Sequence, residues 1–363
     1  MARGCTKKKL ADVVVSKRQK RIDVTSSRPR FVEMDDYQFE GRVYKRLRII
    51  LRSNGCSVPV CTMCPFPNEG IDQNVHKVTA SDYLRQIKSA LSEHTGYEIV
   101  SIYNDGSFFA PEELPSKVRN AIYSLIAEQN CCYLMVESLP NFISRSAIAD
   151  ATKALNNTAL IVGIGLQSSS KTVRDVCIQS PFTSEQFLNA INTLQEFHVR
   201  IKAYVLLKPP FLTEAEALYD ATRTAIWLLR NSIEDVTVCP VRAAPGTVVY
   251  DLYSLDLFKP PKLTTLVRCL HDIKALARPV RISLSNIGSP DLHSITPHGC
   301  EDCESRILDI LKDYNRNPYL VDLGNEYCKE CNTRILLQDP IEFRTRSLLE
   351  RVEFYLGNCS PSE

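Results

Sequence analysis

From about residue 40 to residue 276 the chain alternates short apolar runs with longer segments of helical periodicity. The apolar runs are rich in β-branched and aliphatic residues, which is typical of buried strands. The six predicted strands are Tyr44–Arg52, Glu98–Tyr103, Cys131–Glu137, Ala159–Leu166, Arg200–Leu207 and Asp235–Cys239. Apolar residues spaced three and four apart follow each strand and predict helices over residues 81–93, 111–128, 143–155, 184–197, 214–230 and 262–276.

This alternation predicts an α/β fold built on a parallel sheet. Strands joined by helical crossovers pair in parallel with a right-handed connection. The strands are apolar almost throughout, as expected when both faces of the sheet are covered. Two architectures satisfy the pattern, an open doubly wound sheet and a curved partial barrel. In both, functional groups gather at the carboxyl ends of the strands.

Composition narrows the class of protein. The 363 residues are 44% hydrophobic and 24% charged, as in a soluble globular protein. No apolar run reaches the 18 residues of a membrane span, and the first residues lack the apolar core of a signal peptide. We therefore expect a cytoplasmic protein with no membrane partner. In that compartment 14 cysteines indicate metal ligation and not a disulfide framework.

Charge is distributed unevenly along the chain. Residues 1 to 30 carry ten Lys or Arg against Asp12 and Asp23, a net of +8, whereas the whole chain has a net charge of +2. We interpret residues 1–38 as a flexible basic arm that either binds RNA phosphates or only keeps the protein soluble. The predicted α/β domain then covers residues 39–290, followed by a metal-binding module over 291–345 and a tail over 346–363.

Three cysteines follow the first predicted strand in one short loop. Cys56, Cys61 and Cys64 lie within the sequence LRSNGCSVPVCTMCPFP. An ordinary 4Fe-4S site uses four thiolates, so three in one loop would leave one iron open to a substrate or cofactor. The alternative is a partial zinc site or a group of buried thiols.

Two further cysteine pairs lie near the carboxyl terminus. They are Cys300 with Cys303 and Cys328 with Cys331, each separated by two residues. Two such pairs can close a tetrahedral site and stabilise a small module that lacks a large core of its own. Zinc suits four thiolates, but a second Fe-S cluster would use the same ligands. We therefore predict a zinc-ribbon-like four-cysteine module with either metal.

Six segments resemble the radical S-adenosylmethionine (SAM) superfamily. In order they read YNDGSFF, VESLPNFI, VGIGLQSSS, KAYVLLKPPFLTEAEA, CPVRAAPGT and PHGCEDC. Together they resemble the radical SAM subunits of archaeosine synthases. The segment GIGLQSSS is also similar to an element of the branch that contains the elongator catalytic subunit, the tRNA methylthiotransferases and the oxygen-independent coproporphyrinogen oxidase. The cysteine spacing of four and then two residues differs from the superfamily's usual three and two. This resemblance implies a partial (β/α)6 barrel over residues 39–290.

The resemblance also implies cofactors and site residues. Cys56, Cys61 and Cys64 would hold a 4Fe-4S cluster whose fourth iron binds SAM. The residues implied in SAM binding lie in or at the ends of the second to fifth predicted strands: Asp105, Gly106, Ser107, Glu137, Gln167 and Lys202. The resemblance leaves the catalytic residues unassigned.

The implied activity is a radical SAM lyase of the archaeosine synthase type, which cleaves a lysine adduct on a modified tRNA base. Its partners would be tRNA, a transferase subunit and an electron donor such as flavodoxin or ferredoxin. Two alternatives remain: the same chemistry on a small metabolite or peptide, and a non-catalytic zinc-ribbon protein that binds RNA.

Overall fold

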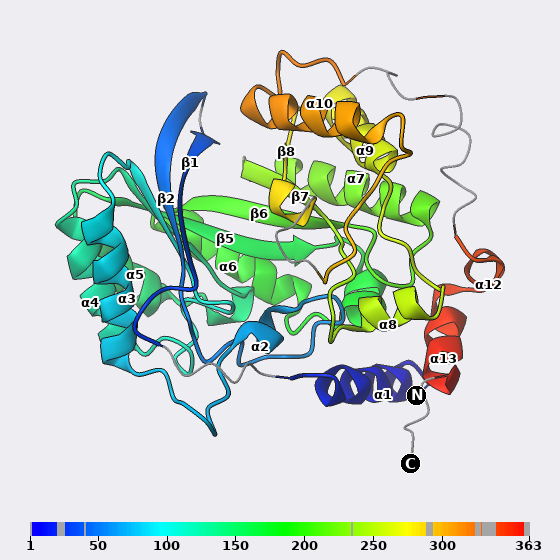
Figure 1. Ribbon diagram of the computed structural model, residues 1–363, viewed down its shortest axis with the longest axis horizontal. Coiled ribbons are helices and arrows are strands. Elements are labelled where there is room, and N and C mark those ends of the chain that lie inside the picture. Colours follow the sequence, from blue (N-terminus) through cyan, green and yellow to red (C-terminus); the bar gives the residue numbers. More distant parts are fainter. Residues whose placement is uncertain are drawn as a thin grey trace.

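Eight strands form one sheet in which the spatial order of the strands is their order in the sequence (Figure 1). The computed structural model describes residues 2–19, 26–39, 41–233, 235–287, 293–323, 328 and 339–358. Strands β2 to β8 pair in parallel, and β1 is antiparallel to β2. Their bounds are β1 (Phe31–Phe39), β2 (Arg42–Ile50), β3 (Ile99–Tyr103), β4 (Tyr133–Glu137), β5 (Ala159–Gln167), β6 (Arg200–Leu207), β7 (Asp235–Pro240) and β8 (Arg281–Ile282).

The helices that connect the parallel strands line the outer face of the curled sheet (Figure 1). They are α3 (Ala80–Glu93), α4 (Ser116–Ala127), α5 (Arg145–Leu155), α6 (Ser184–Glu196), α7 (Glu214–Arg230) and α9 (Leu263–Leu276). Neighbouring helices pack against one another around the sheet. The fold is therefore a partial barrel, as the resemblance implied, and not an open doubly wound sheet. The six predicted strands and their helices are confirmed.

Local capping explains why several helices begin where they do. Thr79, Thr183 and Thr213 precede α3, α6 and α7, and each side chain accepts a hydrogen bond from a backbone N–H one turn into its helix. The third helical residue returns the bond to the cap in all three cases. This reciprocal arrangement, called a capping box, satisfies two backbone N–H donors that the helix itself leaves without partners.

Strand β1 was not predicted, because its sequence FVEMDDYQF is too acidic to read as a buried strand. It forms through pairing with the basic strand β2. The register places Glu33, Asp35 and Asp36 opposite Arg48, Arg46 and Lys45, and each opposed pair forms an ion pair. Cross-strand pairs of opposite charge are the sheet equivalent of charge pairs along a helix.

Tyr37 of β1 closes the amino end of the barrel. Its hydroxyl accepts a hydrogen bond from Lys202 Nζ on β6 (3.0 Å) and donates one to Asp235 Oδ2 on β7 (3.0 Å). Arg46 and Arg281 lie over its ring, at 4.4 and 4.6 Å from the centroid. One residue thus joins β1 to the strands near the opposite edge of the curled sheet.

The basic amino-terminal segment differs from the flexible arm that its charge predicted. Residues Ala2–Ser16 form helix α1, which buries Leu10 and Val14 in the main hydrophobic core. Lys17 beyond the helix forms an ion pair with Asp251 at 2.6 Å. Two apolar residues one turn apart are enough to attach this helix to the domain, although its other positions are mostly polar.

The carboxyl-terminal segment also packs on the barrel, where the sequence predicted a tail. Helix α13 (Leu348–Asn358) lies beside α1 (Figure 1), and Arg351 donates hydrogen bonds to Phe211 O and Glu216. The remaining described elements are α2 (Phe66–Glu69), η1 (Pro140–Phe142), η2 (Val173–Ile178), α8 (Val248–Ser254), η3 (Leu284–Asn286), α10 (Glu304–Arg316) and α12 (Ile341–Arg344). No described helix combines the length and apolar character that crossing a membrane requires.

Candidate functional site

The cysteine loop, residues 51–67, follows directly from the carboxyl end of β2. Cys56, Cys61 and Cys64 are all half-buried in it. Their sulfurs are not gathered within 4.8 Å of one another, the closeness expected around a single metal ion. A four-iron cube is larger than one ion and binds thiolates that are farther apart. Three thiols in one loop are a donor set that such a cluster can use.

Burial keeps these three thiols protonated in the absence of a metal. It raises the pKa of Cys56 to about 12 and that of Cys64 to about 11, and it raises the pKa of Cys61 further. The guanidinium of Arg18 opposes the shift at all three cysteines. One cation cannot balance three buried thiolates, whereas bound iron would supply the missing positive charge.

Thr62 fixes the middle of the cysteine loop. Its Oγ1 donates to Cys177 O at 2.6 Å, and its N–H donates to Ile178 O at 3.1 Å, both in η2. Its carbonyl accepts the N–H of Val248 at the start of α8 (3.0 Å). Cys177 thus contacts the loop through its backbone, while its side chain is buried in the core.

Glu113 joins the cysteine loop to the turn after β3, a role that the sequence analysis did not predict. Its Oε1 accepts the N–H and the hydroxyl of Ser57, both at 2.8 Å. Its Oε2 accepts Asn104 Nδ2 at 3.0 Å and the N–H of Ser107 at 2.5 Å. A Cβ at Gly106 would lie 1.9 Å from Oε2, so only glycine lets the carboxylate approach the turn.

We expect Glu113→Gln to destabilise this site. The amide nitrogen would face N–H donors where an oxygen now accepts two hydrogen bonds, and the side chain is buried. Leaving buried donors without an acceptor costs roughly 2–3 kcal/mol in the free energy of unfolding. Denaturant unfolding of the variant measures this loss. The exposed neighbour Glu112→Gln is the matched control, and equal stability of the two variants would refute the role of Glu113.

The predicted SAM-binding residues after β3 and β4 lie side by side. The N–H of Phe108 donates to Glu137 O at 2.8 Å, and Ser107 Oγ accepts the N–H of Leu139 at 3.1 Å. Asp105 has a φ of +54° and accepts Arg30 Nη2 at 2.8 Å. The structure therefore brings Asp105, Gly106, Ser107 and Glu137 to one part of the site, next to the cysteine loop.

Glu137 is hydrogen-bonded to a residue two strands away. Tyr204 on β6 donates from its hydroxyl to Glu137 Oε1, across β5. Gly163 makes this possible, because a Cβ there would lie 2.9 Å from Glu137 Cγ and 3.0 Å from Tyr204 Cε2. Burial raises the pKa of Glu137, while the Tyr204 hydrogen bond and Lys202 oppose the rise.

Gln167 ends β5 with a φ of +68°. Within the described residues its Oε1 is buried and has no hydrogen-bond partner. A buried amide oxygen normally accepts at least one hydrogen bond, so this atom could accept one from a ligand. Lys202 differs, because its ammonium is engaged by Tyr37 nearer the amino ends of the strands.

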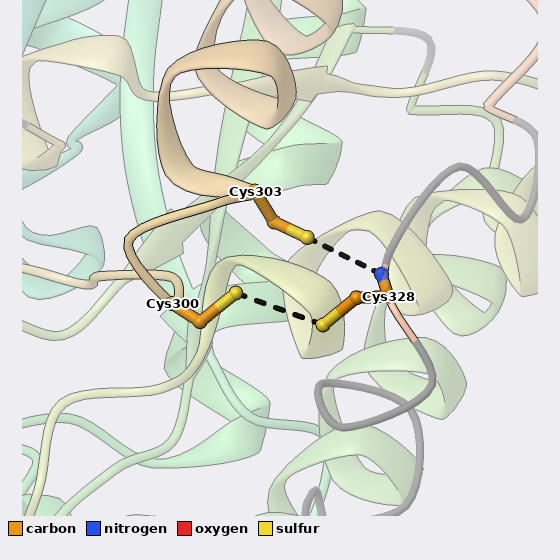
Figure 2. A group of neighbouring side chains, drawn as sticks. All are labelled: Cys300, Cys303 and Cys328. Carbon is orange, nitrogen blue, oxygen red and sulfur yellow. Dashed lines mark hydrogen bonds between the residues drawn. The ribbon is translucent and has the colours of Figure 1, made fainter.

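A second cysteine group lies at the start of α10 (Figure 2). The sulfurs of Cys300, Cys303 and Cys328 all lie within 4.8 Å of one another, and the side chains point toward a common centre. Cys300 Sγ and Cys328 Sγ are 3.7 Å apart. A tetrahedral ion with metal–sulfur bonds of about 2.3 Å requires sulfurs roughly 3.8 Å apart, so the spacing fits one zinc ion. Cys331, the fourth predicted ligand, lies outside the described residues.

No protein-family model matches the sequence. The chain is 26% identical over 318 residues to the archaeosine synthase subunit beta of Methanosarcina acetivorans, covering 83% of this chain and 88% of that one. It is 29% identical over 250 residues to an uncharacterized protein of Methanocaldococcus jannaschii, covering 66% and 67% of the two chains.

Among solved structures, the Elp3 of Methanocaldococcus infernus gives a TM-score of 0.49 at 15% identity. The match covers 66% of this chain and 59% of that one. The comparisons confirm the resemblance to the archaeosine synthase subunits that the sequence motifs indicated.

Proposed function

We propose that this chain is a radical SAM enzyme whose cysteine loop holds a 4Fe-4S cluster through Cys56, Cys61 and Cys64. The observation that carries the proposal is the position of three half-buried thiols at the end of β2, beside the polar groups that end β3, β4 and β5. When bound, the cluster and SAM supply a 5′-deoxyadenosyl radical that abstracts hydrogen from the substrate.

The residues of this chain then bind and orient the cofactor and keep water away. The turn of Asp105, Gly106 and Ser107 offers backbone and carboxylate groups for the amino acid part of SAM. Glu137 and Gln167 offer hydrogen-bond acceptors on the neighbouring strands. Lys202 contributes through its charge, since its ammonium is bound to Tyr37 and opposes the raised pKa of Glu137.

The proposed substrate is a modified base of tRNA that carries a lysine adduct, and the reaction is its radical cleavage in the cytoplasm. Support comes from the two relatives named archaeosine synthase subunit beta, of which this chain covers 88% and 83%. A subunit of that name implies a partner, for which we propose the transferase that attaches the lysine. A flavodoxin or ferredoxin would supply the electron.

At the carboxyl-terminal site we propose a structural zinc ion held by Cys300, Cys303, Cys328 and Cys331. The 3.7 Å between two of the sulfurs supports one ion over a second cluster. Arg306 Nη2 lies 3.8 Å from Cys303 Sγ, and the N–H of Cys328 donates to the same sulfur at 3.2 Å. Such donors stabilise a metal-bound thiolate.

The function is tested with anaerobically purified protein, a reductant, SAM and tRNA that carries the lysine adduct. We expect visible iron-thiolate absorption, release of 5′-deoxyadenosine and a loss of adduct mass in the tRNA. Release of 5′-deoxyadenosine without any change in the tRNA would favour a small-molecule or peptide substrate. Protein that binds zinc but no iron after reconstitution would overturn the enzymatic proposal.

A further inference from the structure

Arg18, two residues beyond α1, contacts the cysteine loop through all three nitrogens of its side chain. Nη2 donates to Cys61 O at 2.7 Å, and Nη1 donates to Cys64 O at 2.8 Å and to Gly246 O at 3.3 Å. Nε donates to Pro59 O at 3.1 Å. Every acceptor is a backbone carbonyl, and two of them belong to the residues whose thiols are the proposed cluster ligands.

Independent contacts hold Arg18 in this position. Leu10 and Val14 bury one side of α1, and Lys17 pairs with Asp251 of α8. The N–H of Gln19 donates to Asn68 Oδ1 at 3.3 Å, and Asn68 Nδ2 donates to Gly246 O at 3.3 Å. The segment that carries Arg18 is thus attached to the barrel before and after the residue itself.

We propose that Arg18 is a positioning residue for the cluster: it fixes the backbone of the cysteine loop and places a positive charge beside the three thiolates. This inference rests on the proposed function of the loop. A guanidinium presents its donors in a rigid fork, so it can fix carbonyls of residues 59, 61, 64 and 246 at once. Lysine has one nitrogen at the end of a flexible stem and cannot reproduce this arrangement.

Two variants separate the effect of the forked arrangement of hydrogen-bond donors in Arg18 from the effect of its positive charge. Arg18→Lys keeps the charge and loses the fork, whereas Arg18→Gln loses both the charge and most of the donors. Lys9→Gln, at an exposed position of α1, is the matched control for lost charge. The first measurement is hydrogen exchange of residues 56–64 in the chain before iron is added. We expect exchange to be about tenfold faster in both Arg18 variants and unchanged in the control.

The second measurement uses chain reconstituted with iron and sulfide. We expect iron to be lost to a chelator about tenfold faster in both Arg18 variants than in the parent chain. The midpoint potential of the cluster should become more negative in Arg18→Gln and stay close to the parent value in Arg18→Lys. The reason is that a nearby cation stabilises the more negative reduced cluster.

The two measurements distinguish this inference from the proposed function. A parent chain that binds no iron would overturn the function, while the exchange experiment would still decide whether Arg18 fixes the loop. Unchanged exchange and unchanged chelator loss in Arg18→Gln would overturn the inference. Equal potentials in the Gln and Lys variants would remove the electrostatic part of it.

Discussion

Replacing Cys61 with alanine is expected to abolish SAM cleavage while the barrel stays folded. Cys61 is the middle of the three proposed ligands, and its carbonyl is held by Arg18. Removing one of three thiolates leaves two irons of the cluster without a protein ligand, and no other thiolate is available within the loop. The expected result is loss of the visible absorption and a fall of 5′-deoxyadenosine formation to the level of iron-free protein.

Cys132→Ala is the matched control, because Cys132 is an exposed thiol just before β4. It should retain the full iron content and activity of the parent chain. Circular dichroism and thermal unfolding of Cys61→Ala should resemble those of the parent chain prepared without iron. A Cys61→Ala variant that still binds a full cluster and cleaves SAM would disprove the ligand assignment.

The second large effect is expected at Cys303, which is 1% exposed at the start of α10. Binding of structural zinc contributes about 10–16 kcal/mol of free energy to the folding of zinc-finger peptides. The four thiolates supply this free energy together, so loss of one should release the ion. We expect about one zinc per parent chain and none in Cys303→Ser. Protease cleavage around residues 297–316 should then become rapid, while the sheet core stays protected.

Treating the parent chain with a strong chelator should reproduce the same cleavage. Cys132→Ser serves as the control, since it removes a thiol of equal size from an exposed position. Retained zinc and unchanged protease resistance in Cys303→Ser would contradict a structural metal. Visible absorption that disappears with this mutation would instead identify a second Fe-S cluster.

The parts of the fold that local patterns determine were predicted well. Helix α7 begins and ends where its periodicity predicted, and a capping box of Thr213 and Glu216 determines its start. The convergence of Gly106 and Glu137 followed from topology alone, since the carboxyl ends of adjacent parallel strands must be neighbours.

The features that the sequence did not reveal depend on contacts between distant segments. Strand β1 has an acidic sequence and becomes a strand only opposite the arginines of β2. Helix α1 buries two apolar residues against elements from the rest of the chain. The donors to Glu113 come from residues 57, 104 and 107, so no local motif marks it.

The contacts of Tyr37 at the amino end of the barrel bear on the order in which ligands bind. Tyr37, Lys202 and Asp235 are each less than a tenth exposed, and Ile99, Met135 and Ile161 fill the adjacent layer. This end is therefore closed to ligands, and the cysteine loop lies at the opposite end, where the strands terminate. A nucleic acid bound over that opposite end would block the exchange of a small cofactor. For the proposed tRNA substrate we therefore expect ordered kinetics, in which SAM binds before the tRNA and the cleavage products of SAM leave after the tRNA.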